Sequence, residues 1–396
     1  MAEPRAHRRR LILFFGAIGL LYAMSEGVLL LAAPSLQGRI DMKRVRDVLK
    51  EQTSAIDGLL TDTAPRLVLD SALGWRHRPG YSVMTDRYNA VGLRSDREYP
   101  IAKPASGLRV AAFGDTYVYA AEVSNEEAWT RLIEVERPTT EVLNYGVSGY
   151  GTDQAYLRFL QEGMLYAPDV VLIGFSPVEL RRSVMVYTRF GSTNEPPLTK
   201  PRFVLDSAQT LVLVPNPLPH RGDWERLRAM PRSVIALGRH DAWYDRWRYE
   251  NALYDRSATM RFAVGLGSRI WQKYFWDDRI VEQGLFRTAS SAFALQQELL
   301  LAFADSVRAR GARPIIVMFP DLEAVERRRD ELPPIYAPLK EAITATRRVP
   351  VIDLLDAFAA EGGARSPQRW FAPRGHYSVE GNAVVARWLG SRLGDD

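Results

Sequence analysis

The feature that most constrains the fold is an apolar run, Leu108–Phe113, that stops at Gly114-Asp115-Thr116. A run of this length is typical of a buried strand, and the Gly-Asp pair marks a turn. A helical pattern begins soon afterwards, near Glu126. Because open α/β sheets bind ligands at the carboxyl ends of their strands, we expect the Thr116 hydroxyl to lie at a binding edge.

Further apolar runs alternate with helical patterns along the chain. Val170–Ile173 and Ile315–Met318 are short and wholly apolar, as strands buried on both faces of a parallel sheet are. This alternation predicts an α/β protein, a three-layer α/β/α sandwich with a parallel sheet of about five strands. The expected strands are 108–113, 141–145, 169–174, 314–319 and 350–353, and the expected helices are 126–136, 152–165, 291–310, 339–346 and 378–393.

Composition excludes several kinds of site. The chain of 396 residues contains no cysteine, so disulfides, thiolate metal ligands and cysteine nucleophiles are absent. The net charge is +5, but the arginines at the N-terminus account for much of it and the remainder is nearly balanced. We therefore expect no nucleic-acid partner, and we expect neither a metal nor another cofactor.

The N-terminal segment has the pattern of a membrane anchor. Arg8-Arg9-Arg10 precedes an apolar run from Leu11 to Ala33, and about 20 apolar residues suffice to span a bilayer as a helix. We expect a cytoplasmic basic tail at 1–10 and a transmembrane helix at 11–28. The arginines predict a single-pass protein of the inner (cytoplasmic) membrane, with its N-terminus in the cytoplasm and its main domain periplasmic or otherwise extracytoplasmic. A cleaved signal peptide is the alternative, since Ala23-Met24-Ser25 has small residues suited to cleavage.

Glu26 interrupts this apolar run. A carboxylate at the middle of a bilayer costs about 2.5–3.5 kcal/mol, so we expect Glu26 at the level of the headgroups. Contact with another membrane subunit is the alternative.

The remainder is expected to comprise a stalk, a main domain and a cap. We assign 29–65 to the stalk, with a charged helix at 34–52 and a linker at 53–65, and 66–396 to the main domain. A cap is inserted at about 182–284, where 203–205 and 211–214 are expected to form a hairpin. Its aromatic and basic segment (243–249 and 271–276) is interpreted as packing the cap onto the domain; a membrane surface and glycan stacking are the alternatives.

Four blocks of sequence, in order and suitably spaced, resemble those of the SGNH/GDSL hydrolases. In the first, Gly114-Asp115-Thr116, Thr116 takes the place of the serine nucleophile. The second runs from Asn144 to Gln154 and matches closely, which places Gly149 at the glycine of the oxyanion hole. The resemblance covers residues 74–393 and implies an acyl-transfer site.

The last two blocks depart from the family. The third ends in Val178-Glu179, where the family has an asparagine and an aspartate. The fourth contains Pro373-Arg374-Gly375-His376, where the family has an aspartate three residues before its catalytic histidine. The resemblance therefore implies that His376 is the base, that Val178 has replaced an oxyanion donor and that Pro373 has replaced the acid.

These replacements weaken an esterase. Thr116 keeps its hydroxyl but adds a methyl group that stiffens χ1. Loss of one oxyanion donor costs about 10²–10³ in rate, and loss of the acid of a triad costs around 10⁴. Arg374, if it pointed inward, would disfavour a charged histidine.

Acidic residues elsewhere offer a way to compensate. Glu179, Asp153 and Asp115 are the candidates to orient His376, although capping of the following turn is the favoured role of Asp115. A carboxylate on the second ring nitrogen of His376 would favour an enzyme.

Because three parts of the site are weakened together, at Thr116, Val178 and Pro373, we favour a degenerate active site. The protein would then be a non-catalytic binding or accessory subunit at the membrane, in a membrane-protein complex or on an envelope glycan. The alternative is an O-acyl esterase or O-acetyltransferase that acts on envelope polysaccharide through Thr116 and His376. The candidate catalytic positions are Thr116, His376 and Gly149, with Val178 and Pro373 degenerate, and the candidate ligand-binding residues are Asp115, Arg374 and Glu179.

Overall fold

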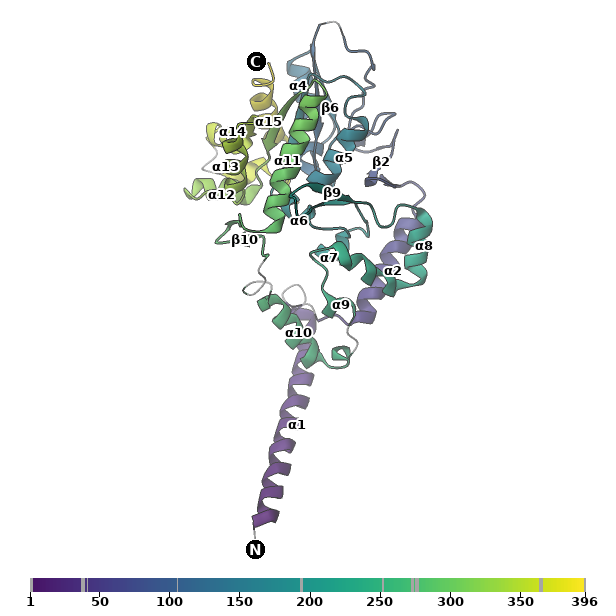
Figure 1. Cartoon of the computed structure of the whole chain (residues 1–396), viewed down its shortest axis with the longest axis vertical. Coiled ribbons are helices and arrows are strands. Elements are labelled where there is room, and N and C mark those ends of the chain that lie inside the picture. The colour runs from purple at the N-terminus through teal and green to yellow at the C-terminus, as the bar shows by residue number, and fades with distance from the viewer. Residues whose placement is uncertain are drawn as a thin grey trace. The chain divides into compact units, whose positions relative to one another are not determined.

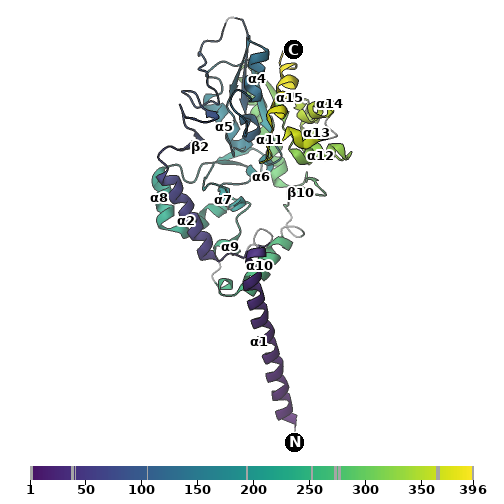
Figure 2. The same ribbon diagram turned by 180° about the vertical axis from the view of Figure 1, so that it is seen from behind.

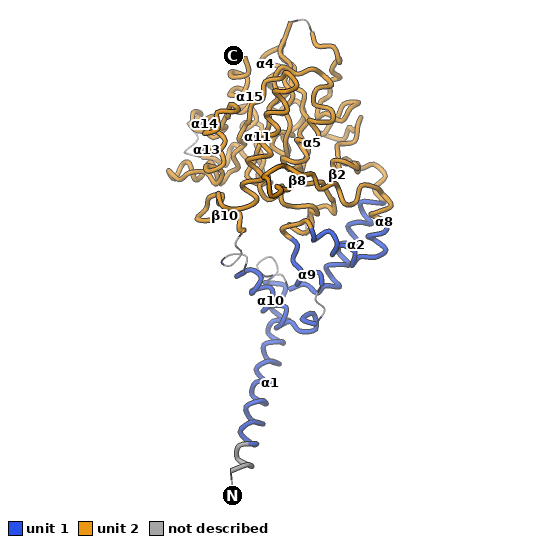
Figure 3. The backbone as a smooth tube through the Cα atoms, in the orientation of Figure 1, with its two compact units in different colours: residues 1–60, 225–239, 244–277 blue, residues 61–224, 240–243, 278–396 orange. Residues whose placement is uncertain are grey.

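The computed structural model describes residues 3–36, 40, 42–104, 106–192, 195–250, 253–271, 274, 278–362 and 366–394 (Figure 1). The chain divides into two compact units (Figure 3). Unit 1 comprises 1–60, 225–239 and 244–277, and unit 2 comprises 61–224, 240–243 and 278–396. The predicted cap at 182–284 is therefore shared between the two units. Phe275 and Trp276 of its aromatic segment lie outside the described residues.

Unit 2 is built on a parallel sheet of five strands in the order β13-β12-β7-β5-β6. Numbered along the chain, this order is 2-1-3-4-5, the flavodoxin-like arrangement, in which the chain changes direction between the first and third strands. The predicted α/β sandwich is confirmed, and the strand bounds differ from the predicted ones by one residue at most. The strands are β5 (Leu108–Phe113), β6 (Thr140–Asn144), β7 (Val170–Phe175), β12 (Arg313–Met318) and β13 (Val351–Asp353).

Helices cover both faces of this sheet (Figures 1 and 2). Val110 and Leu172 share a buried cluster with Trp129 of α4 and Leu389 of α15. Phe113 follows at odd spacing from Val110, so it points to the opposite face, where its ring meets those of α5 and α11. The helices of unit 2 are α3 (Thr116–Tyr119), α4 (Trp129–Glu136), α5 (Thr152–Glu162), α6 (Glu179–Arg182), α7 (Thr188–Gly191), α11 (Ser291–Ala309), α12 (Leu322–Arg329), α13 (Ala337–Thr346), α14 (Leu354–Ala360), η4 (Pro367–Trp370) and α15 (Val379–Gly390).

Small antiparallel hairpins surround the sheet. The predicted hairpin is confirmed, because Phe203 pairs with Leu213 and the Asp206 carboxylate accepts the backbone N–H groups of Ala208 and Thr210 in the turn. The paired strands are β1 (Leu67–Asp70) with β2 (Gly74–His77), β3 (Ser82–Val83) with β4 (Asp86–Arg87), β8 (Arg202–Leu205) with β9 (Leu211–Val214), and β10 (Val281–Glu282) with β11 (Leu285–Phe286).

Unit 1 contains the long N-terminal helix α1 (Glu3–Leu36). In the described part of the chain, Arg8–Leu36 is the stretch long and apolar enough to cross a membrane, by length and composition alone. The predicted linker at 53–65 is wrong, because α2 (Val45–Thr61) continues through most of it and buries a continuous apolar stripe that includes Ile56 and Leu60. The remaining helices are α8 (Arg221–Ala229), η1 (Pro231–His240), α9 (Arg246–Tyr249), η2 (Tyr254–Arg256) and α10 (Ala258–Ile270).

Candidate active site

A cleft of about 470 Å³ lies at the carboxyl edge of the sheet in unit 2. Asp115 and Thr116 directly follow β5, and Ser176 follows its neighbour β7, so the cleft adjoins the point where the strand order reverses. The lining includes five of the predicted site residues, which are Thr116, Gly149, Val178, Arg374 and His376.

Asp115 lies beneath the cleft and organises the strand ends. Its side chain is buried, and Oδ1 accepts the backbone N–H of Tyr117 at 2.9 Å. Its other oxygen accepts the Ser176 hydroxyl at 2.7 Å and Nη1 of Arg182 at 3.2 Å. The prediction that Asp115 caps the following turn is therefore confirmed. Because the carboxylate is enclosed by these donors, it is not placed to meet a ligand directly.

Thr116 is the first residue of α3 and is half-buried at the wall of the cleft. Within the described chain its hydroxyl makes no hydrogen bond of its own. The neighbouring Tyr117 hydroxyl donates to the carbonyl of Gly375 at 3.0 Å, next to His376. This bond brings the segments of Thr116 and His376 together across the cleft.

His376 is oriented by a carboxylate that the sequence analysis did not identify. Its Nδ1 lies 2.7 Å from Oε2 of Glu122, and its backbone N–H donates to the same oxygen at 3.1 Å. The other Glu122 oxygen accepts the backbone N–H of Arg374 at 2.9 Å. The Glu122 side chain is only 7 % exposed, whereas that of His376 is 24 % exposed toward the cleft.

The turn directly before His376 explains why a proline stands where the SGNH/GDSL hydrolases have their aspartate. The N–H of Gly375 donates to the carbonyl of Ala372 at 2.9 Å, which places Pro373 at the second position of a β-turn, where its fixed φ is favourable. Pro373 is exposed, and the backbone N–H groups after it point at Glu122. The inference that His376 lacks an acid because of Pro373 is therefore wrong. The acid comes from the segment after α3.

Glu122 occupies a strained backbone conformation, with φ of 71°, and Ala120 before it has φ of 61°. Non-glycine residues in this region cost of order 1–3 kcal/mol and persist where surrounding contacts hold them. Here the holding contacts are the two N–H groups of the histidine turn. The residue with the strained backbone is therefore the one whose carboxylate lies beside the imidazole of His376.

The ionisation of Glu122 determines whether Nδ1 of His376 carries a proton. Partial burial opposes ionisation, but the N–H groups of Arg374 and His376 and the imidazole outweigh it and hold the pKa of Glu122 below its ordinary value. An ionised carboxylate only accepts hydrogen bonds, so Nδ1 carries a proton. In the neutral ring this tautomer leaves Nε2 as the acceptor, the arrangement that a general base requires.

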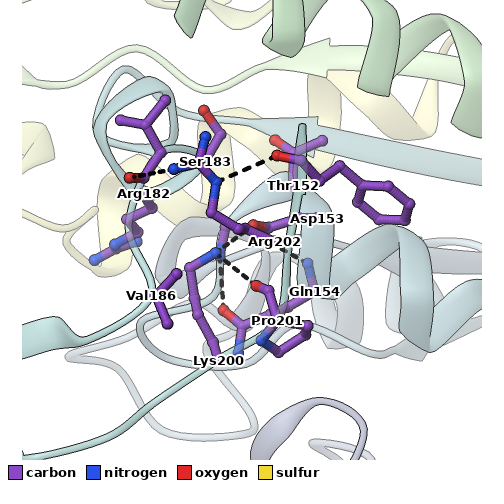
Figure 4. A network of polar contacts seen from close by, with 12 residues as sticks. Thr152, Asp153, Gln154, Arg182, Ser183, Val186, Lys200, Pro201 and Arg202 are labelled. Atoms are coloured by element: carbon purple, nitrogen blue, oxygen red, sulfur yellow. Dashed lines mark hydrogen bonds and ion pairs between the residues drawn. The ribbon is translucent and has the colours of Figure 1, made fainter. Parts of the chain in front are cut away.

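The acids that are the alternative candidates to orient His376 are engaged elsewhere. Glu179 is fully buried, accepts the Thr152 hydroxyl and the Ser176 N–H, and has its pKa raised well above the ordinary value by burial and by nearby Asp115. Asp153 forms a buried ion pair with Lys200, which also donates to the carbonyl of Pro201 at 3.2 Å (Figure 4). None of these three candidates orients His376, and the burial of Glu179 leaves it no direct contact with a ligand.

One donor for an oxyanion remains, and one is missing. Gly149 has φ of +84°, a conformation that favours glycine, and no partner for its N–H is found in the described residues. Val178 lines the cleft with 39 % of its surface exposed and has no polar side-chain atom. The site thus has a hydroxyl, an oriented base and one backbone donor, but the side-chain donor expected at Val178 is absent.

The mouth of the cleft is basic and aromatic. Arg181 stacks on the Trp243 ring, 4.5 Å from its centroid, and both residues line the cleft. Arg374 is largely exposed, with its Nε 3.5 Å from Glu122, so its charge is turned toward that carboxylate and the solvent. Arg182 donates to Asp115 and to the carbonyl of Tyr150.

No protein-family model matches the chain, and no curated protein matches it. Several solved structures do match. A lipolytic protein of the G-D-S-L family from Desulfitobacterium hafniense is 11% identical, with a TM-score of 0.35 over 72% of this chain and 99% of that chain. A catalytic mutant of an acetylxylan esterase from Geobacillus stearothermophilus is 13% identical, with a TM-score of 0.37 over 74% of this chain and 98% of that chain. A G-D-S-L protein from Veillonella parvula is 10% identical, with a TM-score of 0.35 over 71% of this chain and 95% of that chain.

In unit 2 itself, the strand order and the meeting of Thr116, Gly149, Val178 and His376 at the carboxyl edge are what the resemblance of the four sequence blocks implies.

Proposed function

We propose that unit 2 is an acyl-transfer enzyme, an O-acyl esterase or O-acyltransferase, in which Thr116 is the nucleophile, His376 the base and Glu122 the residue that positions the base. The observation that supports this proposal most is the Glu122 carboxylate on Nδ1 of His376. Of the three replacements that favour a degenerate site, at Thr116, Val178 and Pro373, the one at Pro373 is offset by this carboxylate.

The reaction follows from the protonation of the ring. Nε2 of His376 removes the proton of the Thr116 hydroxyl as its oxygen attacks the carbonyl carbon of an ester, and the charge on the carbonyl oxygen is met by the N–H of Gly149. The tetrahedral intermediate collapses, and the leaving alcohol takes the proton from the imidazolium. Water, or the hydroxyl of an acceptor, then attacks the acyl-threonine with the same base and regenerates Thr116.

The mouth of the cleft supports a carbohydrate as the acyl carrier. The stacked pair of Arg181 and Trp243 offers a planar, cationic surface that suits a sugar ring with anionic groups, and the exposed Arg374 adds a second cation at the cleft. The substrate class that we propose is an O-acylated, anionic envelope glycan.

We further propose that α1 anchors the protein in the cytoplasmic membrane, with Arg8-Arg9-Arg10 inside and unit 2 outside. Length and apolar composition support the span, and the arginines support the direction. We also propose a membrane-protein complex as partner, because an acyl donor made inside the cell would have to cross the membrane to reach unit 2.

A second candidate is a binding domain without turnover. Val178 and the methyl group of Thr116 favour it, because both weaken attack on a carbonyl. The experiment is hydrolysis of p-nitrophenyl acetate by the full-length protein in detergent. We expect slow turnover that Thr116→Ala abolishes. The matched control is Ser148→Ala, which removes the other hydroxyl near Gly149 in the cleft.

Turnover that survives Thr116→Ala would contradict the assignment of the nucleophile. A parent protein that binds acylated glycan but hydrolyses neither the glycan ester nor p-nitrophenyl acetate would support the binding domain instead.

A further inference from the structure

Helix α10 in unit 1 is apolar on its outer face as well as on much of its inner face, and the polar side chains that point inward are paired. Arg261 is only 5 % exposed and points inward, where it donates to the carbonyls of Met42 and Asp255 at 2.9 and 2.6 Å. Ser268 also points inward and donates to Asp245 at 3.1 Å. The residues turned outward along the same helix are mostly apolar: Met260, Ala263, Leu266, Gly267 and Ile270.

The outward face is large enough to need a covering. Met260 is 47 % exposed, Leu266 37 % and Ile270 42 %, and Trp271 and Tyr274 just beyond the helix are 59 % and 60 % exposed. A surface helix in water has charged and polar residues on its outer face. A helix that is apolar nearly all round, and whose inward polar groups are paired, matches a lipid environment instead.

The attachment of α10 to α1 indicates which lipid surface it meets. The Glu26 carboxylate accepts the backbone N–H groups of Ala258 and Thr259 at 2.6 and 3.0 Å and the Ser257 hydroxyl at 2.7 Å. The Ser25 and Thr259 hydroxyls lie 3.0 Å apart. Glu26 therefore caps the first turn of α10, and Ser25 on the same turn of α1 adds a further bond.

The depth of this attachment can be estimated along α1. At 1.5 Å per residue, Glu26 lies about 24 Å beyond Arg10 on the helix axis. The hydrocarbon core is about 30 Å thick, so with Arg10 at one boundary Glu26 lies within the far leaflet or at its edge. Unpaired backbone N–H groups at this depth cost several kcal/mol each. Glu26 accepts the first two of those of α10, from Ala258 and Thr259, which gives a reason for a carboxylate inside an apolar run.

We propose that α10 is a second membrane-embedded element, which lies in the leaflet farther from Arg8-Arg9-Arg10 with Met260, Leu266 and Ile270 against lipid. Glu26 holds it to α1, and Trp271 and Tyr274 meet the interface, where aromatic side chains are favoured. Arg269, also exposed, is long enough to reach the phosphates. This inference relies on the proposed span of α1 and is independent of catalysis.

The absence of cysteine makes the test direct, because any introduced cysteine is unique. Met260→Cys and Ile270→Cys are labelled with a fluorophore sensitive to polarity, and the full-length protein is reconstituted in phosphatidylcholine vesicles. Phe15→Cys reports on α1, and Leu332→Cys, 50 % exposed in unit 2, reports on water. We expect quenching by spin-labelled lipid at 260 and 270 to be several-fold stronger than at 332.

Each control separates one failure from another. Quenching at 15 together with water-like behaviour at 260 and 270 would overturn the inference and leave the anchor intact. Quenching at neither 15 nor 260 would overturn the anchor as well. Protection at 260 that grows with the protein-to-lipid ratio would show that a second copy covers the face, and would also overturn it.

The role of Glu26 is tested by Glu26→Ala in the Met260→Cys background. Loss of its carboxylate leaves the N–H groups of Ala258 and Thr259 unpaired, so we expect the label at 260 to move to a shallower, more heterogeneous position. The label at 15 should keep its quenching. An unchanged depth at 260 would overturn the assignment of Glu26 as the residue that holds α10.

Discussion

Glu122 and His376 are 254 residues apart in the chain, and the carboxylate of the first lies 2.7 Å from Nδ1 of the second. The same carboxylate accepts the backbone N–H groups of Arg374 and His376. The histidine ring and the turn that carries it are therefore oriented by one side chain. This relationship supports the proposed role of His376 as a base, because in the neutral ring the tautomer that Glu122 favours has its acceptor at Nε2.

Glu122→Gln should lower kcat by about 10²–10⁴, because an amide can donate to Nδ1 and hold the ring in the wrong tautomer. The glutamine amide has only one oxygen, so it can accept only one of the backbone N–H groups of Arg374 and His376. We therefore expect a small loss of stability. Initial rates of ester hydrolysis measure the effect, and Glu126→Gln serves as the control, since the Glu126 side chain is 56 % exposed and pairs with Arg87. An activity equal to that of the parent would refute the positioning role of Glu122.

Thr116→Ser combined with Val178→Asn should raise the rate. The first change removes the methyl group beside the attacking oxygen, and the second supplies an amide donor near Gly149, which is worth about 10²–10³ in rate where such a donor is aimed at the oxyanion. We expect the gain in kcat and little change in KM. Val178→Leu in the Thr116→Ser background separates the donor from the change of size, and equal rates in these two double variants would rule out an oxyanion role at 178.

The fold was predictable from local pattern, whereas the site was predictable only in part. Buried parallel strands such as Val170–Phe175 leave a wholly apolar signature, so β7 was located to within one residue. Thr116, Gly149 and His376 follow strands or precede a helix, and the topology brings them to one edge.

Glu122 left no such signature. It is not part of a periodic pattern of apolar residues, its backbone is in the left-handed region, and its partner, His376, is 254 residues away. A usable signal was its position shortly after Thr116, because a segment that follows β5 must begin at the carboxyl edge of the sheet. The partner of Glu26 was hidden for the same reason, since Ala258 is 232 residues away.

Stability should depend on pH through Glu179. Burial and nearby Asp115 raise its pKa in the folded state well above the ordinary value of 4.5. Between pH 4.5 and that raised pKa the folded protein keeps a proton that the unfolded chain has lost, so the free energy of unfolding decreases as pH rises through this window. Below pH 4.5 both states are protonated, and this stabilising contribution is fully present.

Glu179→Gln should remove this dependence, because the amide stays neutral at every pH. Denaturant unfolding between pH 4 and 8 should therefore show the variant gaining stability relative to the parent as pH rises. Glu341→Gln, a change at an exposed carboxylate, is the control. Parent and Glu179→Gln curves that stay parallel across the range would mean that Glu179 titrates alike in both states.

Removal of one partner of the buried ion pair of Asp153 and Lys200 should destabilise the protein much more than neutralisation of both. Both side chains are at most 1 % exposed, and burial raises the pKa of Asp153 and lowers the pKa of Lys200. Lys200→Met leaves a buried carboxylate without a counter-charge, which costs about 3–5 kcal/mol. Asp153→Asn in the same chain should recover most of that loss, since the Asn oxygen can still accept the N–H of Gln154 as Asp153 does at 2.8 Å.

Urea unfolding of the parent, both single variants and the double variant measures the coupling free energy between the two side chains. The exposed pair of Arg87 and Glu126, 45 % and 56 % exposed, is the matched control, and Arg87→Met should cost no more than about 1 kcal/mol. If the double variant were as unstable as Lys200→Met alone, the loss would come from the packing of the lysine stem and not from an unpaired charge. Recovery in the double variant would identify the unpaired buried carboxylate as the source of the loss in Lys200→Met.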